Sequence, residues 1–201
     1  MKIIVIGATG TIGSAVADAL AGRGHDVVRA ARSHGDQRVD IESAESIARM
    51  YEAVGSFDAV VCAAGRASFK PLEELSEEDF HLGLHSKLMG QVNVVRLGLA
   101  RVADGGSFTL TSGVLAGEPV PGSAAFSLTN AAVEAFAHAA ALEMPRRVRV
   151  NVVSPPWVSE TLEAMGRSGS GGLPAASVAQ AYVESVEGGR NGATIDARTF
   201  R

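Results

Sequence analysis

The residues best placed to bind a ligand come early in the chain, in the stretch GATGTIG at positions 7–13. Three glycines at this spacing allow a tight turn at Gly7, a close approach of the backbone to a pyrophosphate at Gly10, and close packing of a helix on a strand at Gly13. A helix that begins here adds free N–H groups and the positive end of its dipole, so the pattern indicates a phosphate-binding loop. The alternative is a turn that binds nothing, but the glycines together with the hydroxyls of Thr9 and Thr11 exceed what a turn requires.

The end of the next apolar segment bears on which dinucleotide would bind. An NAD site usually has an acidic residue about 20 positions after the glycines, where it holds the ribose hydroxyls. Here residues 28–33 read VRAARS and contain no acid. Arg32 and Ser33 can instead hold a 2′-phosphate through charge-assisted hydrogen bonds, so we expect NADP rather than NAD. The alternative is that Arg32 is a solvated surface charge.

The elements that must position these residues alternate between two periods. Short continuous apolar runs, typical of parallel strands buried on both faces, are followed by segments with helical spacing. This alternation predicts βαβ units and a doubly wound parallel α/β sheet, the Rossmann fold, in a single domain over residues 1–201. Strands are expected at 3–6, 27–28, 39–41, 59–62, 108–110, 148–153 and 194–197, and helices at 12–20, 43–55, 72–75, 77–102, 124–143, 160–165 and 179–186.

With these elements in place, the chain resembles the short-chain dehydrogenase/reductase family. Five segments carry the resemblance: the glycine loop, Asp40-Ile41, the stretch CAAG at 62–65, Thr111-Ser112-Gly113, and SPPWV at 154–158. In the family these segments bind pyrophosphate, touch adenine, follow the fourth strand, carry the catalytic serine and touch nicotinamide. The cofactor-binding residues that the resemblance and the loop imply are Gly7, Thr9, Gly10, Thr11, Ile12, Gly13, Arg32, Ser33, Asp40, Ile41, Ala63, Ala64, Gly65 and Val158.

The resemblance also implies a catalytic set of serine, tyrosine, lysine and asparagine, and two of these are missing. Ser112 matches the serine. The tyrosine and lysine of the family's Y-x-x-x-K are replaced by Phe126 and Asn130, in a phase fixed by the following residues 131–136. Phe126 has no ionisable group, and Asn130 can hydrogen-bond a ribose but supplies no positive charge. The usual proton relay therefore cannot operate.

A lysine stands where the family commonly has its asparagine, three residues before Gly90. We hypothesise that Lys87 points inward and supplies the missing charge, as general acid or as a partner of Ser112 at the substrate oxygen. Burial beside a cofactor would lower its pKa. The alternative is a Lys87 that reaches solvent. Ser112, Lys87 and Asn130 are therefore the candidate catalytic residues.

Other titratable residues are given structural roles. His81 and His85 lie four apart but lack a third ligand, so we expect no metal site. Tyr182 and Tyr51 are expected to pack in the core.

Composition limits the classes of partner. The 201 residues are 46% hydrophobic and 20% charged, with a net charge of −4 and one cysteine, Cys62. There is no basic cluster for nucleic acid, no apolar run long enough to span a membrane, and too short an N-terminal run for a signal peptide. We expect a cytoplasmic protein, a homodimer or homotetramer through the helices at 77–102 and 124–143, and a small-molecule substrate.

The most favoured function is NADP-dependent oxidation or reduction of a small alcohol or carbonyl with an altered proton relay. Two other classes stay open. One is a non-redox enzyme on the same scaffold, such as a cyclase, dehydratase or isomerase. The other is a non-catalytic NADP(H)-binding sensor.

Overall fold

A single sheet of seven strands organises the computed structural model, which describes residues 1–200. Every pair of neighbouring strands is parallel, in the order β3-β2-β1-β4-β5-β6-β7. This confirms the doubly wound sheet predicted from the sequence. The strands are β1 (Lys2–Ile6), β2 (Asp26–Ala31), β3 (Gln37–Arg38), β4 (Phe57–Cys62), β5 (Val102–Thr111), β6 (Arg149–Ser154) and β7 (Thr194–Asp196).

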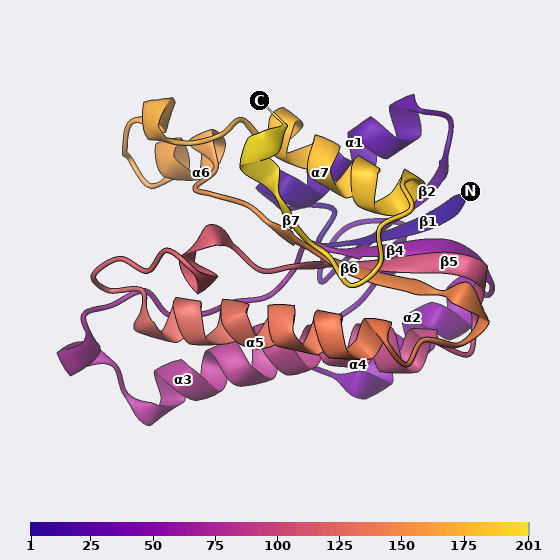
Figure 1. The fold of residues 1–201 in the computed structure, drawn as a ribbon, viewed down its shortest axis with the longest axis horizontal. Coiled ribbons are helices and arrows are strands. Elements are labelled where there is room, and N and C mark those ends of the chain that lie inside the picture. The colour runs from indigo at the N-terminus through magenta and orange to yellow at the C-terminus, as the bar shows by residue number, and fades with distance from the viewer. Residues whose placement is uncertain (201) are drawn as a thin grey trace.

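Helices cover both faces of the sheet (Figure 1). One face carries α1 (Thr11–Gly22), α6 (Ser159–Ala164) and α7 (Ala175–Glu187), and the other carries α2 (Ala44–Val54), α3 (Glu77–Gly83), α4 (Gly90–Gly98) and α5 (Ala124–Ala141). A short 3₁₀ turn, Leu72–Glu74, precedes α3. Within residues 1–200, no helix combines the length and the apolar character needed to cross a bilayer.

Strand β1 shows why the two layers form. All of its residues from Ile3 onward are at most 1% exposed. Because successive side chains point to opposite faces, Ile4 and Ile6 enter the core beneath α2, α4 and α5, whereas Ile3 and Val5 enter the core beneath α1 and α7. A continuous apolar run therefore serves both layers at once.

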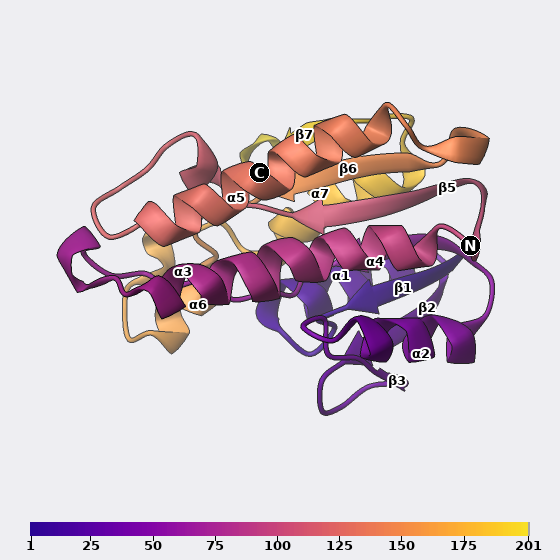
Figure 2. The same ribbon diagram turned by 90° about the horizontal axis from the view of Figure 1, so that it is seen from below.

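The direction of winding reverses between β1 and β4. From β1 the chain adds β2 and β3 on one side, and from β4 it adds β5, β6 and β7 on the other (Figure 2). At such a switch point the loops after neighbouring strands diverge and leave a crevice at their carboxyl ends. Here the diverging loops are the glycine loop after β1 and residues 63–71 after β4.

Several predicted elements differ from the structure in their extent. The strands expected at 27–28 and 108–110 are longer, at Asp26–Ala31 and Val102–Thr111, and the helix expected at 179–186 begins earlier, at Ala175. The strand expected at 39–41 is instead β3 at Gln37–Arg38, because Asp40 and Ser43 form the turn that starts α2: Ser43 N–H donates to the Asp40 carbonyl, and the Ser43 hydroxyl caps the helix. The helix expected at 77–102 ends at Gly98, since a turn closed by Arg101 N–H and the Gly98 carbonyl leads directly into β5.

That same helix is also interrupted by a π-helical turn at Leu84–Met89, between α3 and α4. One extra residue in a helical turn rotates the side chains that follow, and such turns are frequent at functional sites. This turn contains Lys87.

Candidate active site

The glycine loop adopts the geometry that its spacing predicted. Gly7 has a φ of 84°, and its N–H donates to the Ala30 carbonyl at 2.8 Å. A side chain at Gly13 would place its Cβ 2.0 Å from the Gly7 carbonyl oxygen, so only glycine lets α1 approach β1 this closely. Gly10 precedes the helix, whose first turn has no side-chain cap and no acidic residue. The free N–H groups at this end are therefore available to an anion.

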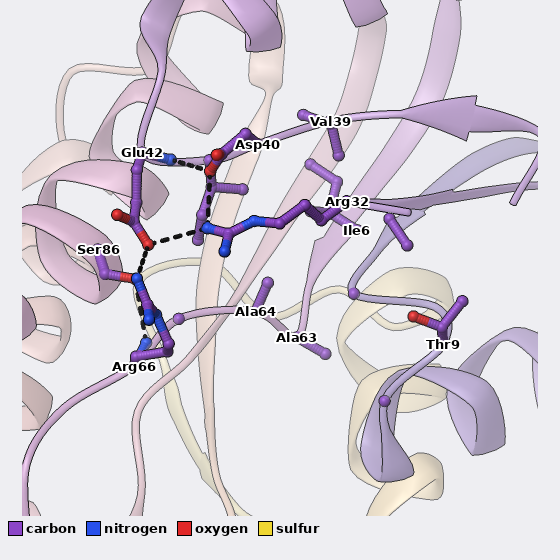
Figure 3. A pocket seen from close by; sticks show the side chains of 15 residues that line it. Ile6, Thr9, Arg32, Val39, Asp40, Glu42, Ala63, Ala64, Arg66 and Ser86 are labelled. Carbon is purple, nitrogen blue, oxygen red and sulfur yellow. Dashed lines mark hydrogen bonds and ion pairs between the residues drawn. The ribbon is translucent and has the colours of Figure 1, made fainter. Parts of the chain in front are cut away.

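A first cavity of about 260 Å³ opens beside this loop at the switch point (Figure 3). It is bounded by the loops after β1, β2, β3 and β4, and by the π turn. Its lining includes most of the residues expected to bind a dinucleotide, and also Glu42, Arg66 and Ser86, which the sequence reading missed: Ile6, Gly7, Thr9, Gly10, Ala31, Arg32, Val39, Asp40, Ile41, Glu42, Ala63, Ala64, Gly65, Arg66 and Ser86. Ser33 is not part of this lining, and its hydroxyl pairs with His34 Nδ1 at 2.9 Å.

Charged side chains of both signs meet at one end of the first cavity. The Arg32 guanidinium lies 3.1 Å from Asp40 Oδ1 and 3.1 Å from Glu42 Oε1. Arg66 lies 2.7 Å from the same Glu42 oxygen. Arg32 is thus not a free surface charge but part of an ion-pair cluster. Arg66 directly follows the AAG stretch, and that position was the only sequence signal that could have pointed to it.

A second cavity of about 480 Å³ adjoins the first, and Ala63, Ala64 and Gly65 line both. Aromatic rings form much of its wall. The Phe69 ring lies edge-on to Phe126, with centroids 6.2 Å apart, and to Trp157, with centroids 5.7 Å apart. Ile12, Asn130 and Val158 also line this cavity, together with Lys87 and Ser112. The second cavity therefore combines an apolar wall with a few polar groups.

Lys87 is buried in this wall, with 7% of its surface exposed. Its Nζ donates to the Ser112 carbonyl at 2.9 Å and to Asn130 Oδ1 at 2.6 Å, and it lies 5.6 Å from the centroid of the Phe126 ring. The stem passes over Gly65, where a Cβ would come within 2.8 Å of three Lys87 atoms. The hypothesis that Lys87 points inward is consistent with this placement, and the structure adds that Asn130 is its direct partner.

Burial lowers the pKa of Lys87 to about 8, against the smaller opposing effects of Cys62 and Glu134. Within residues 1–200, Lys87 forms no ion pair, so two carbonyl dipoles and one ring face are its close partners. An amine with this pKa exchanges a proton readily near neutral pH, which suits a general acid or base.

The Ser112 hydroxyl is directed elsewhere. It donates to Glu134 Oε1 on α5 at 2.6 Å and lies 3.4 Å from the Val153 carbonyl. What Ser112 offers to Lys87 is its main-chain carbonyl. The sequence predicts that Lys87 and Ser112 act together at the substrate oxygen, and in the structure their direct contact is through the Ser112 main-chain carbonyl.

The remaining titratable residues lie outside the two cavities or within the core. Tyr182 is fully buried and shares a 2.7 Å hydrogen bond with the Thr111 hydroxyl, and the Tyr51 hydroxyl donates to the Val94 carbonyl. This confirms their structural roles. His81 is exposed beside Glu77. In the described part of the chain, no three His, Cys, Asp or Glu side chains are grouped so that they could hold a metal ion.

Comparisons with known proteins agree with this geometry. A family model described as enoyl-(acyl carrier protein) reductase matches residues 7–192. An uncharacterized oxidoreductase of Methylorubrum extorquens is 30% identical over 83% of this chain and 77% of its own length. A hydroxynaphthalene reductase of Aspergillus fumigatus is 32% identical over 68% of this chain, which spans about half (54%) of that relative's length.

Solved structures are similar over nearly the whole chain. The protein lin1944 from Listeria innocua is 44% identical, with a TM-score of 0.92 and 98% of each chain covered. A small-chain dehydrogenase in complex with NADPH is 26% identical, with a TM-score of 0.85, covering 98% of this chain and 95% of the other. The fold, the glycine loop at the switch point and these matches lead to one conclusion: the chain belongs to the short-chain dehydrogenase/reductase family.

Proposed function

We propose that the protein is an NADP(H)-dependent oxidoreductase of a small carbonyl or alcohol, in which Lys87 handles the proton at the substrate oxygen. The observation that carries the proposal is the position of the Lys87 amine. It is buried in a cavity with apolar walls that adjoins the cavity built around the glycine loop. A proton donor next to a dinucleotide site is the minimum that carbonyl reduction requires.

The residues present fit a nicotinamide dinucleotide. A side chain at Gly7 or Gly13 would collide with the neighbouring main chain, so the loop is kept open at these positions. The start of α1 leaves its N–H groups free for a pyrophosphate. Asp40 and Ile41 would hold the adenine end, and Ile12 and Val158 would lie at the nicotinamide end, because they line the second cavity. The NADPH bound to a similar dehydrogenase supports the same choice of cofactor. When bound, the nicotinamide would supply or accept the hydride.

Lys87 has one N–H bond to spare for a substrate. A protonated amine has three donors, and two of them are used by the Ser112 carbonyl and Asn130 Oδ1. The third is free to donate to a substrate oxygen. In reduction Lys87 gives this proton to the oxygen as its negative charge develops, and in oxidation the neutral amine takes it back.

Asn130 and Ser112 position the amine and do not exchange protons themselves. Each offers Lys87 a carbonyl oxygen, and the Ser112 backbone is in turn held by the hydrogen bond from its hydroxyl to Glu134. Phe69, Phe126 and Trp157 give this region an apolar wall.

We further propose that copies of the chain pair through α4 and α5. The outward side of α5 carries exposed alanines at Ala124, Ala131 and Ala135, and Leu128 is 45% exposed. Small side chains let helices approach closely, which suits a symmetric contact between two α5 helices.

The test is to measure NADPH binding by calorimetry and NADPH consumption with a panel of aldehydes and ketones, for the wild type and two variants. Lys87→Met keeps the aliphatic stem but removes the charge, and we expect turnover to fall about 100-fold or more with NADPH binding retained. Lys2→Met is the matched control, since Lys2 lies at the start of β1 and bonds only the Val54 carbonyl through Nζ.

Three results would contradict the proposal. If the protein binds neither NADPH nor NADH, the proposed cofactor is wrong. If Lys87→Met turns over as fast as the wild type, Lys87 does not transfer the proton. Tight NADPH binding with no consumption on any carbonyl favours the non-redox enzyme or the sensor.

A further inference from the structure

The ion-pair cluster at the end of the first cavity includes two residues, Glu42 and Arg66, that have no role in the proposed function. Figure 3 shows the side chains of Arg32 and Arg66 both pointing toward Glu42, one from the right of the view and one from below. Arg32 follows β2, Glu42 lies between β3 and α2, and Arg66 follows β4. Three loops that are distant in sequence thus bring two positive groups to one carboxylate, beside the residues expected to hold the adenosine.

Glu42 is the most enclosed member of this cluster. Its side chain is 23% exposed, whereas each arginine is 57% exposed. Its pKa is lowered, chiefly by the hydrogen bond from Arg66, so it is ionised at neutral pH. The main chain of Arg66 is also fixed, because its N–H donates to the Ser86 hydroxyl at 3.2 Å. The arginine side chains are therefore the most exposed parts of the cluster.

The charges in the cluster balance as they stand. Arg32 and Arg66 contribute two positive charges, and Asp40 and Glu42 contribute two negative ones. A 2′-phosphate that enters this end meets arginines already occupied by carboxylates. Exposed ion pairs of this kind contribute little stability, so a phosphate that can accept two parallel hydrogen bonds from a guanidinium competes well against them.

We propose that Arg66 is a second ligand of the cofactor's 2′-phosphate, beside Arg32, and that Glu42 is a built-in competitor that pairs with both arginines until the phosphate displaces it. This inference rests on the proposed use of NADP(H). Arg66 and Glu42 then have opposite effects on the preference for NADP(H) over NAD(H). Arg66 increases this preference, and Glu42 limits it.

The test measures binding and does not require turnover. Calorimetric titrations compare NADPH with NADH, and 2′,5′-ADP with 5′-AMP, which differ only in the 2′-phosphate. In Arg66→Leu we expect NADPH and 2′,5′-ADP to bind about tenfold more weakly, with NADH and 5′-AMP within about twofold of the wild type. In Glu42→Gln we expect the two phosphorylated ligands to bind about fivefold more tightly, a gain that a damaged fold cannot imitate. Arg49→Leu is the control, because Arg49 pairs with Glu45 on the exposed side of α2.

The results distinguish the proposed roles of Arg66 and Glu42 from the proposed use of NADP(H). If the wild type prefers 2′,5′-ADP over 5′-AMP but Arg66→Leu leaves that ratio unchanged, Arg66 is not a phosphate ligand and the inference is overturned while the cofactor proposal stands. A Glu42→Gln variant with unchanged or weaker phosphate binding overturns the competitor role. If the wild type binds none of the four ligands, both proposals fall together.

Discussion

At the scale of single residues, Lys87 is the feature that sets this protein apart from the pattern it resembles. A buried amine normally pairs with a carboxylate, because removing its charge from water is costly. Lys87 instead has two carbonyl oxygens and the face of Phe126. The nearby carboxylate of Glu134 is engaged by the Ser112 hydroxyl. The result is an amine that is positioned firmly but gives up its proton easily.

This arrangement predicts a pH dependence of stability. The pKa of Lys87 falls from its usual 10.5 to about 8 in the folded protein, chiefly through burial. Between these two values the unfolded chain binds more protons than the folded chain, so the free energy of unfolding rises with pH, by about 3 kcal/mol in total. Below pH 8 the amine is charged in both states and this contribution is absent.

The measurement is urea denaturation of the wild type and Lys87→Met at several pH values from 7 to about 10.5. Other groups titrate in both proteins and cancel in the difference. We expect the wild type to gain stability relative to Lys87→Met as the pH rises above 8. A difference that is flat across this range would mean that the folded-state pKa of Lys87 is not depressed.

At the scale of elements, the π turn carries a lysine and α5 an asparagine, the reverse of what the family resemblance implies. The resemblance places an asparagine where Lys87 lies and a lysine where Asn130 lies. The two side chains are in direct contact, with Lys87 Nζ 2.6 Å from Asn130 Oδ1. One amine and one amide therefore lie together, with the amine on the π turn and the amide on α5. We propose that the lysine of the family pattern has moved from α5 to the π turn.

Stability should show this coupling. Asn130→Lys alone places two amines side by side in the core and should cost at least about 3 kcal/mol of stability. Lys87→Asn alone leaves Asn130 and the Ser112 carbonyl without their donor and should cost about 2–4 kcal/mol. The double variant restores one donor and one acceptor, and we expect a favourable coupling of about 2 kcal/mol.

Thermal and urea denaturation of the four proteins in this cycle measures the coupling. Strictly additive single effects would indicate that the contact does not matter to the fold. As a control, the stability effects of Lys87→Asn and Lys2→Met should be additive, since Lys2 lies at the amino end of strand β1.

At the scale of the whole molecule, the sheet joins two cavities of different character. The first has charged groups and a phosphate loop, and the second has an aromatic wall and a buried amine. They meet at Ala63–Gly65, after β4, because the winding reverses between β1 and β4. An extended dinucleotide would pass from one cavity to the other across this strip.

Trp157 allows this orientation to be tested, because it is the only tryptophan and lines the second cavity. We expect NADPH to quench the fluorescence of Trp157 strongly, since its nicotinamide would lie beside the indole. A 2′,5′-ADP molecule should bind in the first cavity and leave this emission almost unchanged. Equal quenching by both ligands, at concentrations that saturate each, would contradict the proposed orientation.

The sequence by itself determined the fold and the glycine turn after its first strand. Continuous apolar runs such as 3–6 predict strands buried on both faces, and the glycines at 7, 10 and 13 predict the turn that joins β1 to α1. These are local patterns, whose meaning depends on neighbours a few residues away. The sequence also predicts that Phe126 and Asn130 stand where the family resemblance implies a tyrosine and a lysine, because the residue type at each position is read directly.

Only the tertiary structure decided which side chains act together. Lys87 and Asn130 are 43 positions apart, and Ser112 and Glu134 are 22 apart. Arg66 joins Glu42 across 24 positions, and Ser33 turns out to lie outside the cavity it was expected to line. Such pairs are set by the packing of helices on the sheet and by the π turn, in which Lys87 is buried. No periodicity in the sequence encodes these contacts, so they could be identified only once the elements were placed in space.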